Sequence, residues 1–273
     1  MTAPTAALAA ELDARLQGSV VPGRAEQEKA YLKSSLHHLG VPVPGMRAAV
    51  RGLLRRHPGL DRAAVLALVE ELWARPVHES RSCAGFLLEA RERMLVPADL
   101  ALLERMLEQC DTWAHVDVIA PKAAGPLLLR FPGTAEVLLR WSRRDELWVR
   151  RGGVLGHLPA LRSPERFPLF FGEFGALADP LLTDPRFFVR KALGWSLREG
   201  ARHHPEEVCD WLAGRLPRVS GLTLREALKP VPQEVRLRLL PGHGDLQQGP
   251  FAREHLGPRD GEPPAPDVLR QRD

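Results

Sequence analysis

The 273-residue chain has few of the residue types that mark disulfide-rich or membrane proteins. Its three cysteines, Cys83, Cys110 and Cys209, lie far apart and form no Cys/His cluster with zinc-ligand spacing, so we expect buried thiols in a reducing cytosol. No run approaches the roughly 18 consecutive apolar residues that a membrane span needs. The N-terminus also lacks the charged segment and long apolar core of a secretory signal. These absences predict a cytoplasmic protein with no membrane partner.

Signals for β-structure are weak as well. The chain contains a single Tyr and few Thr, and no segment shows sustained period-2 alternation of β-branched residues. Apolar residues recur with helical spacing instead, and Pro and Gly fall in the gaps. The sequence therefore predicts an all-α protein. The expected helices span about 4–18, 24–39 (ending at Gly40), 45–57, 61–74, 79–95, 98–110, a helix opening at 113, 134–143, 146–158, 166–181, 186–202, 206–215 and 222–230.

Local signals mark several helix boundaries. Asp61 is an expected N-cap, and Thr112 or Asp111 is expected to cap the helix that opens at Trp113. The paired prolines of Val41–Gly45 predict a connector, because a proline interrupts helical hydrogen bonding.

A short motif repeats forty residues apart. Trp148-Val149-Arg150-Arg151 recurs as Phe188-Val189-Arg190-Lys191, at the same place on a predicted helix. A period of about 40 residues with paired helices is typical of HEAT-like solenoids. We therefore expect a helical-repeat solenoid that presents the basic pair of each copy on a concave face.

Positive charge is concentrated in the stretch that carries the repeat. The chain has a pI near 9.3, and residues 140–202 contain twelve Lys and Arg against seven Asp and Glu, whereas residues 1–110 are nearly balanced at fourteen against thirteen. A row of cations suits a nucleic-acid backbone, and a solvated charged face explains the same surplus.

The apolar run that begins at Trp113 holds an indole and a carboxylate four residues apart. On a helix, Trp113 and Asp117 are one turn apart on one face. A carboxylate between Val116 and Val118 is costly to desolvate unless a partner pairs with it. Spacing alone leaves two interpretations open: Asp117 anchors a neighbouring element, or it is held ready for a cationic partner.

Four blocks of the sequence resemble the AlkD-type DNA alkylation repair glycosylases, an all-helical HEAT-like family that excises alkylated bases from DNA. The blocks follow one another in the order and spacing of that family, and the resemblance runs from about residue 31 to about residue 232. They are Thr112–Asp117 (TWAHVD), Asp145–Arg151 (DELWVRR), Phe187–Glu199 (FFVRKALGWSLRE) and, more weakly, Leu222–Ala227 (LTLREA).

The resemblance assigns roles to individual positions. It places the family's catalytic carboxylate at Asp117, the two tryptophans that flank the deoxyribose at Trp113 and Trp195, and a contact to the DNA backbone at Arg151. It also implies double-stranded DNA as the partner, held without inserting the damaged base into a pocket. The other residues expected to contact DNA are Arg150, Arg190, Lys191 and Tyr31.

These residue types suit the chemistry of such a reaction. A purine alkylated at N7 of guanine or N3 of adenine is cationic, so it leaves without the paired carboxylates of glycosidases. One carboxylate stabilises the positive charge that develops on the sugar and orients water. Two indole faces add cation–π attraction of roughly 0.5–2 kcal/mol each.

Two departures from the family concern the range of substrates. Gly152-Gly153 follows Arg151, and two glycines either cost helix stability, roughly 1 kcal/mol each, or let another backbone approach closely. Pro42 and Pro44 are expected to stiffen the loop after the second helix. Both features bear on which adducts are accepted, bulky ones included.

Three functions remain open from the sequence. The first is a glycosylase for cationic alkylpurines. The alternative is a non-catalytic HEAT-like protein that binds damaged or branched DNA by shape and phosphate contacts. The third is a protein-interaction module, which the basic surplus disfavours.

The remaining expectations concern organisation and cofactors. We expect a monomer with one domain over residues 1–240, and a disordered tail over 241–273, which is rich in Gly, Pro and charge. The histidine pairs His37/His38 and His203/His204 show no metal-ligand spacing, so we expect no metal and no cofactor.

Overall fold

The computed structural model describes residues 4–240, and every regular element in that part of the chain is helical, which confirms the all-α prediction. The α-helices are α1 (Thr5–Gln17), α2 (Arg24–Leu32), α3 (Val43–Arg56), α4 (Arg62–Trp73), α5 (His78–Ala90), α6 (Leu100–Glu108), α7 (Trp113–Ile119), α8 (Gly125–Arg130), α9 (Ala135–Ser142), α10 (Leu147–Leu155), α11 (Leu158–Arg162), α12 (Phe167–Ala178), α13 (Phe187–Ala201), α14 (Pro205–Ala213), α15 (Gly221–Ala227) and α16 (Gln233–Leu239). Short 3-10 turns lie at Glu92–Met94, Pro97–Asp99, Pro132–Thr134 and Asp179–Leu181. A π-helical turn at Ala120–Ala124 joins α7 to α8. The predicted tail lies outside the described residues.

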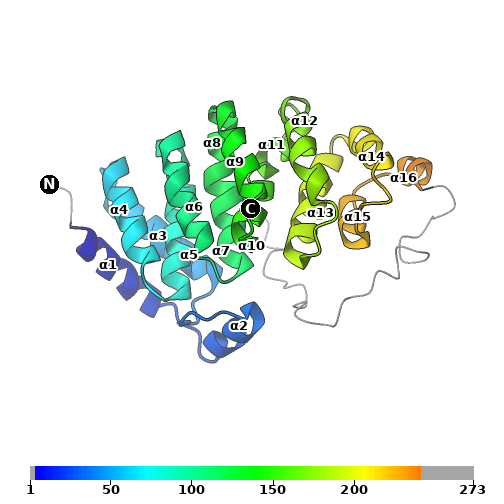
Figure 1. The fold of residues 1–273 in the computed structure, drawn as a ribbon. Coiled ribbons are helices and arrows are strands. Elements are labelled where there is room, and N and C mark those ends of the chain that lie inside the picture. The colour runs from blue at the N-terminus through cyan, green and yellow to red at the C-terminus, as the bar shows by residue number, and fades with distance from the viewer. Residues whose placement is uncertain (1–3, 241–273) are drawn as a thin grey trace.

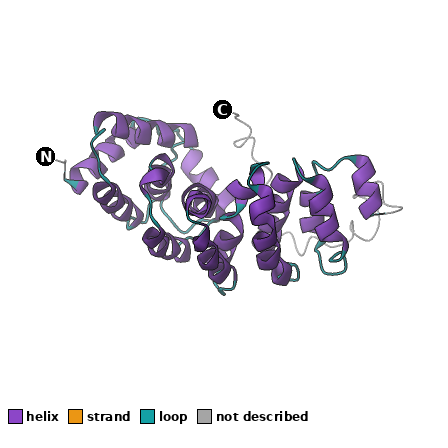
Figure 2. Cartoon of the chain, turned by 90° about the horizontal axis from the view of Figure 1, so that it is seen from above, coloured by secondary structure: helices purple, strands orange, loops and turns teal. Residues whose placement is uncertain are grey.

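The helices follow one another across the molecule in roughly the order of the chain, from α1 and α4 at one end to α14 and α16 at the other (Figure 1). Helix α2 lies apart from this row, at its lower edge. The view from above shows the same helices joined by loops at their ends (Figure 2). None of the helices within residues 4–240 combines the length and apolar character needed to cross a bilayer.

The repeated motif occupies equivalent positions in the fold. Trp148 and Phe188 are the second residues of α10 and α13, and their ring centroids are 5.0 Å apart. In Arg150 and Arg190, Nε donates to the carbonyl six residues earlier, at 2.6 and 2.8 Å. Arg81 on α5 makes the same contact at 3.2 Å. The predicted repeat is therefore visible as the same attachment of an arginine to the loop before its own helix, in α5, α10 and α13.

The core forms two clusters that meet at α7 and α10. Ile119 and Val149 belong to the first cluster, which extends back to α1. Ala120 and Val154 belong to the second, which extends to α16. This junction between the clusters carries the site described below. The domain boundary at residue 240 stays a prediction.

Two predicted helix starts are confirmed by their caps. The Asp61 carboxylate accepts a hydrogen bond from the backbone N–H of Ala64 at 2.8 Å, and the Thr112 hydroxyl accepts one from Ala114 at 3.2 Å. Both satisfy N–H groups that the first turn of a helix leaves unpaired.

The second helix ends well before Gly40, so the predicted boundary is wrong. Lys33 adopts a left-handed conformation with φ of 52°, which stops the helix. The buried Glu79 carboxylate then accepts hydrogen bonds from the backbone N–H groups of Leu39, Gly40 and Val41, at 2.7–3.1 Å. Glu79, which is distant in the sequence, thus accepts the backbone hydrogen bonds that helical carbonyl groups would accept if the helix continued to Gly40.

Three further boundaries differ from the prediction. Residues 43–45 belong to α3 rather than to a connector, because Pro42 and Pro44 fall before and within the first turn, where proline is tolerated. The predicted helix over 146–158 stops at Leu155, and α11 follows as a separate helix. Helix α16 has no counterpart in the prediction.

Candidate active site

Helix α7 places Asp117 at the junction of the two core clusters. Thr112 caps the helix, Trp113 is its first residue and Asp117 its fifth, so the indole and the carboxylate lie one turn apart as predicted. Directly after this helix, Pro121 lies in the π-helical turn, where its missing N–H favours departure from the α-helical pattern.

The partner of Asp117 is Arg151 on α10. Nε of Arg151 donates to Oδ1 at 2.9 Å and Nη2 donates to Oδ2 at 3.0 Å, which is the two-pronged geometry of a strong Arg–carboxylate pair. Nη1 donates to the carbonyl of Phe188 on α13 at 2.6 Å. Arg151 is only 3% exposed. The carboxylate therefore has the partner that its apolar flanks require, and three helices meet at one guanidinium.

Asp117, Arg151 and Lys191 have the same register in the stack. They are the fifth residues of α7, α10 and α13, respectively. The repeat therefore brings this position of each helix to one face, and a carboxylate in one copy faces a guanidinium in the next.

Burial and pairing act in opposite directions on Asp117. Burial raises the pKa of this carboxyl, and Arg151 opposes the rise through its charge and hydrogen bonds, with a net result above the usual Asp range. The side chain keeps 19% of its surface exposed, whereas that of Arg151 keeps 4%. Asp117 is thus the member of the pair that a ligand reaches.

Asp117 opens into a cleft of about 990 Å³ that Trp195 also lines. Trp195 lies on α13, packs partly on the second core cluster, and donates through Nε1 to Glu199 at 3.3 Å. The other lining residues are Glu89, Glu92, Arg93, Pro121, Lys122, Pro126, Leu129, Arg130, Leu158, Pro159, Arg162 and Ser163. The structure therefore brings Asp117 and Trp195 from two helices to one hollow.

Trp113 and Tyr31 form a separate contact beside this cleft. Their rings meet edge to face with centroids 6.1 Å apart, and both side chains are half-buried. The loop after α2 is fixed nearby, because Asp111 accepts hydrogen bonds from the backbone N–H of Ser35 at 2.7 Å and from the hydroxyl of Ser34 at 3.0 Å. Helix α2 thus presents Tyr31 to α7.

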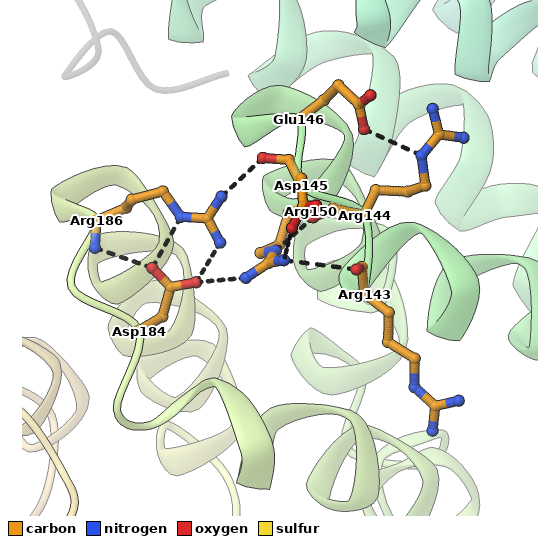
Figure 3. Close-up of polar contacts among 7 residues, drawn as sticks. All are labelled: Arg143, Arg144, Asp145, Glu146, Arg150, Asp184 and Arg186. Carbon is orange, nitrogen blue, oxygen red and sulfur yellow. Dashed lines mark hydrogen bonds and ion pairs between the residues drawn. The ribbon is translucent and has the colours of Figure 1, made fainter.

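Arg150 is occupied by contacts within the chain. Its Nη1 donates to Asp184 at 2.8 Å, and Asp184 also accepts from the backbone and guanidinium of Arg186 (Figure 3). Burial alone raises the pKa of Asp184, but the bonds from Arg186 and Arg150 outweigh it and lower that pKa to about 2. The Arg143 guanidinium points away from this network in Figure 3. Arg150 therefore joins α10 to the segment before α13, and its contact to DNA stays a prediction.

The second basic pair is less enclosed than the first. Arg190 is half-buried and attached to the carbonyl of Asp184, whereas Lys191 keeps 39% of its side chain exposed beside Glu226 at 3.9 Å. Among the four cations that the two copies of the motif contain, Lys191 is thus the most accessible to solvent and Arg151 the least.

Sequence reasoning missed the cations that line the cleft, namely Arg93, Lys122, Arg130 and Arg162. They come from three separate segments of the chain, so no local spacing identifies them. It also missed a buried group formed by Glu28, His38 and His78. The spacing of His37 and His38 does not indicate this group, because the partners of His38 lie 10 residues before and 40 residues after it in the sequence.

Comparison with protein families gives one assignment. The family model described as DNA alkylation repair enzyme matches residues 12–231, which is most of the described chain. No curated protein sequence matches the chain.

Solved structures show the same fold at low sequence identity. A predicted DNA alkylation repair enzyme from Enterococcus faecalis superposes with a TM-score of 0.68 at 20% identity, over 77% of this chain and 96% of that one. AlkD2 from Streptococcus mutans gives 0.58 at 16% identity, over 84% and 99%. The protein smu.31 from Streptococcus mutans UA159 gives 0.53 at 18% identity, over 68% and 100%.

Proposed function

The chain belongs to the DNA alkylation repair enzyme family, and from that premise we propose that it is a DNA glycosylase. Its proposed substrates are cationic alkylated purines in duplex DNA, N7-alkylguanine and N3-alkyladenine, and assays on bulky adducts decide whether these belong to the range. The reaction is hydrolysis of the N-glycosidic bond. The observation that carries this proposal is the Asp117 carboxylate, held through both oxygens by Arg151 and opening into a cleft shared with Trp195.

The remaining bonding capacity of Asp117 fits this role. An ionised carboxylate has about four acceptor positions, and Arg151 occupies two of them. In the proposed reaction the remaining positions attract positive charge that develops on the deoxyribose and accept a hydrogen bond from the attacking water. Since the guanidinium fixes the carboxylate, little reorganisation is needed as that charge develops.

The aromatic residues supply a second kind of attraction. An indole face attracts a cation by roughly 0.5–2 kcal/mol, and Trp195 lines the cleft that Asp117 faces. We assign the other side of the same sugar to Trp113, which lies one turn before Asp117 on α7 and contacts Tyr31. A purine that is already cationic needs no second carboxylate to protonate it.

Contacts with the DNA backbone complete the proposal. We assign them to Lys191, Arg190 and Tyr31, and to the cations lining the cleft. We also assign Arg151 and Arg150 to contacts with the DNA backbone. In this structure, however, their guanidinium groups bind Asp117 and Asp184. The main role of these two arginines is therefore to position the two carboxylates, and a contact with phosphate is their second role.

One observation favours a non-catalytic alternative. The ion pair between Asp117 and the buried Arg151 is also consistent with a structural role, in which it holds adjacent repeats together and takes part in no reaction. In that case the protein binds damaged or branched DNA by shape and phosphate contacts.

Release of free base separates the two functions. We expect the full chain to release N7-methylguanine and N3-methyladenine from methylated duplex DNA, measured by mass spectrometry. Asp117→Asn keeps the size of the side chain and removes its charge, so release should fall by about a hundredfold or more while DNA binding is retained.

Asp210→Asn is the matched control, because Asp210 is an exposed carboxylate on α14. It should release base at the rate of the unsubstituted protein. Circular dichroism checks that both variants fold, since Asp117→Asn leaves Arg151 with a weaker partner. Equal release by both variants would show that Asp117 is not the catalytic group. Tight binding without release, on bulky N3-adenine adducts as well, would favour the non-catalytic alternative.

A further inference from the structure

Three buried histidines and a glutamate gather beneath α2, away from the cleft. The rings of His38 and His78 are stacked with centroids 4.4 Å apart, and His115 lies 4.8 Å from His78. Glu28 approaches from α2, with Oε2 3.7 Å from Nδ1 of His38. His38 is in the loop after α2, His78 is the first residue of α5, and His115 is on α7.

Several polar atoms of this group lack a hydrogen-bond partner among the described residues. They are Oε2 of Glu28, both ring nitrogens of His38, Nδ1 of His78 and Nδ1 of His115. His38 and His78 are only 5% and 3% exposed. A buried polar atom without a partner costs roughly 1–3 kcal/mol, so three such side chains facing one another need a compensating contact.

The carboxylate of Glu28 and the rings of His38 and His78 each turn one potential ligand atom toward the same small volume. A single divalent cation meets the requirement, because it accepts electron pairs from neutral imidazoles and from a carboxylate at once. The neutral imidazole is the form that binds a metal.

The outer atoms of two ligands are already held. Oε1 of Glu28 accepts a hydrogen bond from Arg24 at 3.0 Å, which leaves Oε2 directed at the histidines. Nε2 of His78 lies 3.5 Å from the hydroxyl of Ser82, which leaves Nδ1 as the inner atom. Outer contacts of this kind orient metal ligands in proteins.

The inner atoms lie close together, but further apart than the ligands of a bound zinc ion. One ligand atom from each of Glu28, His38 and His78 lies within 4.8 Å of the others. Tetrahedral zinc with bonds near 2.0–2.1 Å brings its ligand atoms to roughly 3.4 Å from one another. The His38 and His78 rings are also stacked nearly parallel, at 8°. Binding one ion therefore requires one ring to turn and the Glu28 side chain to rotate, so that all three ligand atoms point at one position.

We propose that Glu28, His38 and His78 bind one divalent transition-metal ion, with Zn²⁺ the ion best suited to two imidazoles and a carboxylate. The site is buried and separate from the cleft of Asp117, so the ion is structural. It fixes α2, whose one buried residue is Leu32, to the start of α5. Since α2 carries Tyr31, the ion also sets the position of Tyr31 against Trp113.

Metal content tests the proposal directly. The full chain is stripped with a chelator, equilibrated with Zn²⁺ alone and passed through a desalting column. We expect one zinc per chain by mass spectrometry, and a higher thermal midpoint with Zn²⁺ than with chelator. Co²⁺ in place of Zn²⁺ should give the visible absorption of a four-coordinate site with nitrogen and oxygen ligands.

Three variants make the result specific. His38→Ala and Glu28→Gln should lose the retained zinc and the thermal shift. His37→Ala should keep both, because the His37 side chain is exposed and only its backbone pairs with residues 76–78. Glu28→Gln changes no side-chain volume and serves if His38→Ala fails to fold. The proposal is overturned if the unsubstituted protein retains no zinc, or if His37→Ala loses as much as the other two.

Discussion

The Asp117 carboxylate experiences two opposing influences at the scale of one residue. Its apolar surroundings disfavour the charge, and Arg151 favours it, with burial the larger effect. The folded protein therefore holds this carboxyl at a pKa above its unfolded value, so its contribution to stability is present at low pH and is lost as pH rises through the folded pKa. The ionised form that the proposed reaction needs is thus maintained at some cost in stability.

Arg151→Lys should move the pH dependence of base release. Because the ionised carboxylate is the active form, the rate rises with pH through the raised pKa of Asp117. Lysine cannot reproduce the two parallel hydrogen bonds, so that pKa should rise further and the acid limb should shift to higher pH. Single-turnover release between pH 4 and 8 measures the limb.

Arg150→Lys is the control for this shift. Arg150 is the neighbouring residue on α10 but pairs with Asp184 rather than Asp117. Its variant should keep the original acid limb. An unchanged limb in Arg151→Lys would mean that Arg151 does not govern the charge of Asp117.

At the scale of elements, Gly153 of α10 allows α9 to approach closely, whereas Gly152 faces the side chain of Leu107 on α6. A Cβ added to Gly153 would lie 2.6 Å from the carbonyl oxygen of Leu138 and from the backbone nitrogen of Ser142. Of the two consequences that the sequence left open, lower helix stability or close backbone approach, the structure shows the second. The approach keeps Arg151, two residues before Gly153, in place against α7.

Gly153→Ala should destabilise the protein by about 1–3 kcal/mol, because α9 and α10 must separate to admit the methyl group. Gly172→Ala on α12 is the matched substitution, since nothing lies within 4 Å of its added Cβ. It should stabilise the protein by about 0.5–1 kcal/mol through helix propensity. Urea unfolding measures both, and equal effects would contradict the packing explanation.

At the scale of the whole molecule, the positive charge is largely neutralised by contacts between repeats. Arg144 on the segment before α10 pairs with Glu104 and Glu108 of α6 at 2.8 and 2.7 Å, and Arg198 on α13 pairs with Glu226 on α15 at 2.5 Å. The surplus at residues 140–202 therefore overstates the charge available to DNA. The cations that line the cleft gain importance accordingly.

Binding to duplex DNA should weaken with salt, and Arg93→Gln should lower the slope of log affinity against log salt by about one unit. The Arg93 side chain is 93% exposed and lines the cleft. Arg105→Gln should leave the slope unchanged, because Arg105 pairs with Glu70 and neither residue lines the cleft. Fluorescence anisotropy over 50–200 mM salt makes the comparison. Equal slopes for the unsubstituted protein and both variants would show that the cleft is not part of the DNA-binding surface.

The sequence by itself determined what depends on near neighbours. Helical periodicity predicted the all-α class, Asp61 and Thr112 predicted two helix starts, and the motif at Trp148 and Phe188 predicted a repeat. The same local pattern placed Asp117 one turn from Trp113 and required a partner for it. Each of these features is set by residues within one or two turns, or by a period that the sequence displays.

Only the tertiary structure decided which residues meet across repeats. Arg151 binds Asp117, which lies 34 positions earlier in the sequence. Glu79 accepts hydrogen bonds from the loop after α2, 38–40 positions away. Glu28 lies close to His38 and His78. These meetings depend on how closely successive helices stack, and small residues such as Gly153 set that distance. Local propensity carries no information on it, because the partners share no turn, cap or period.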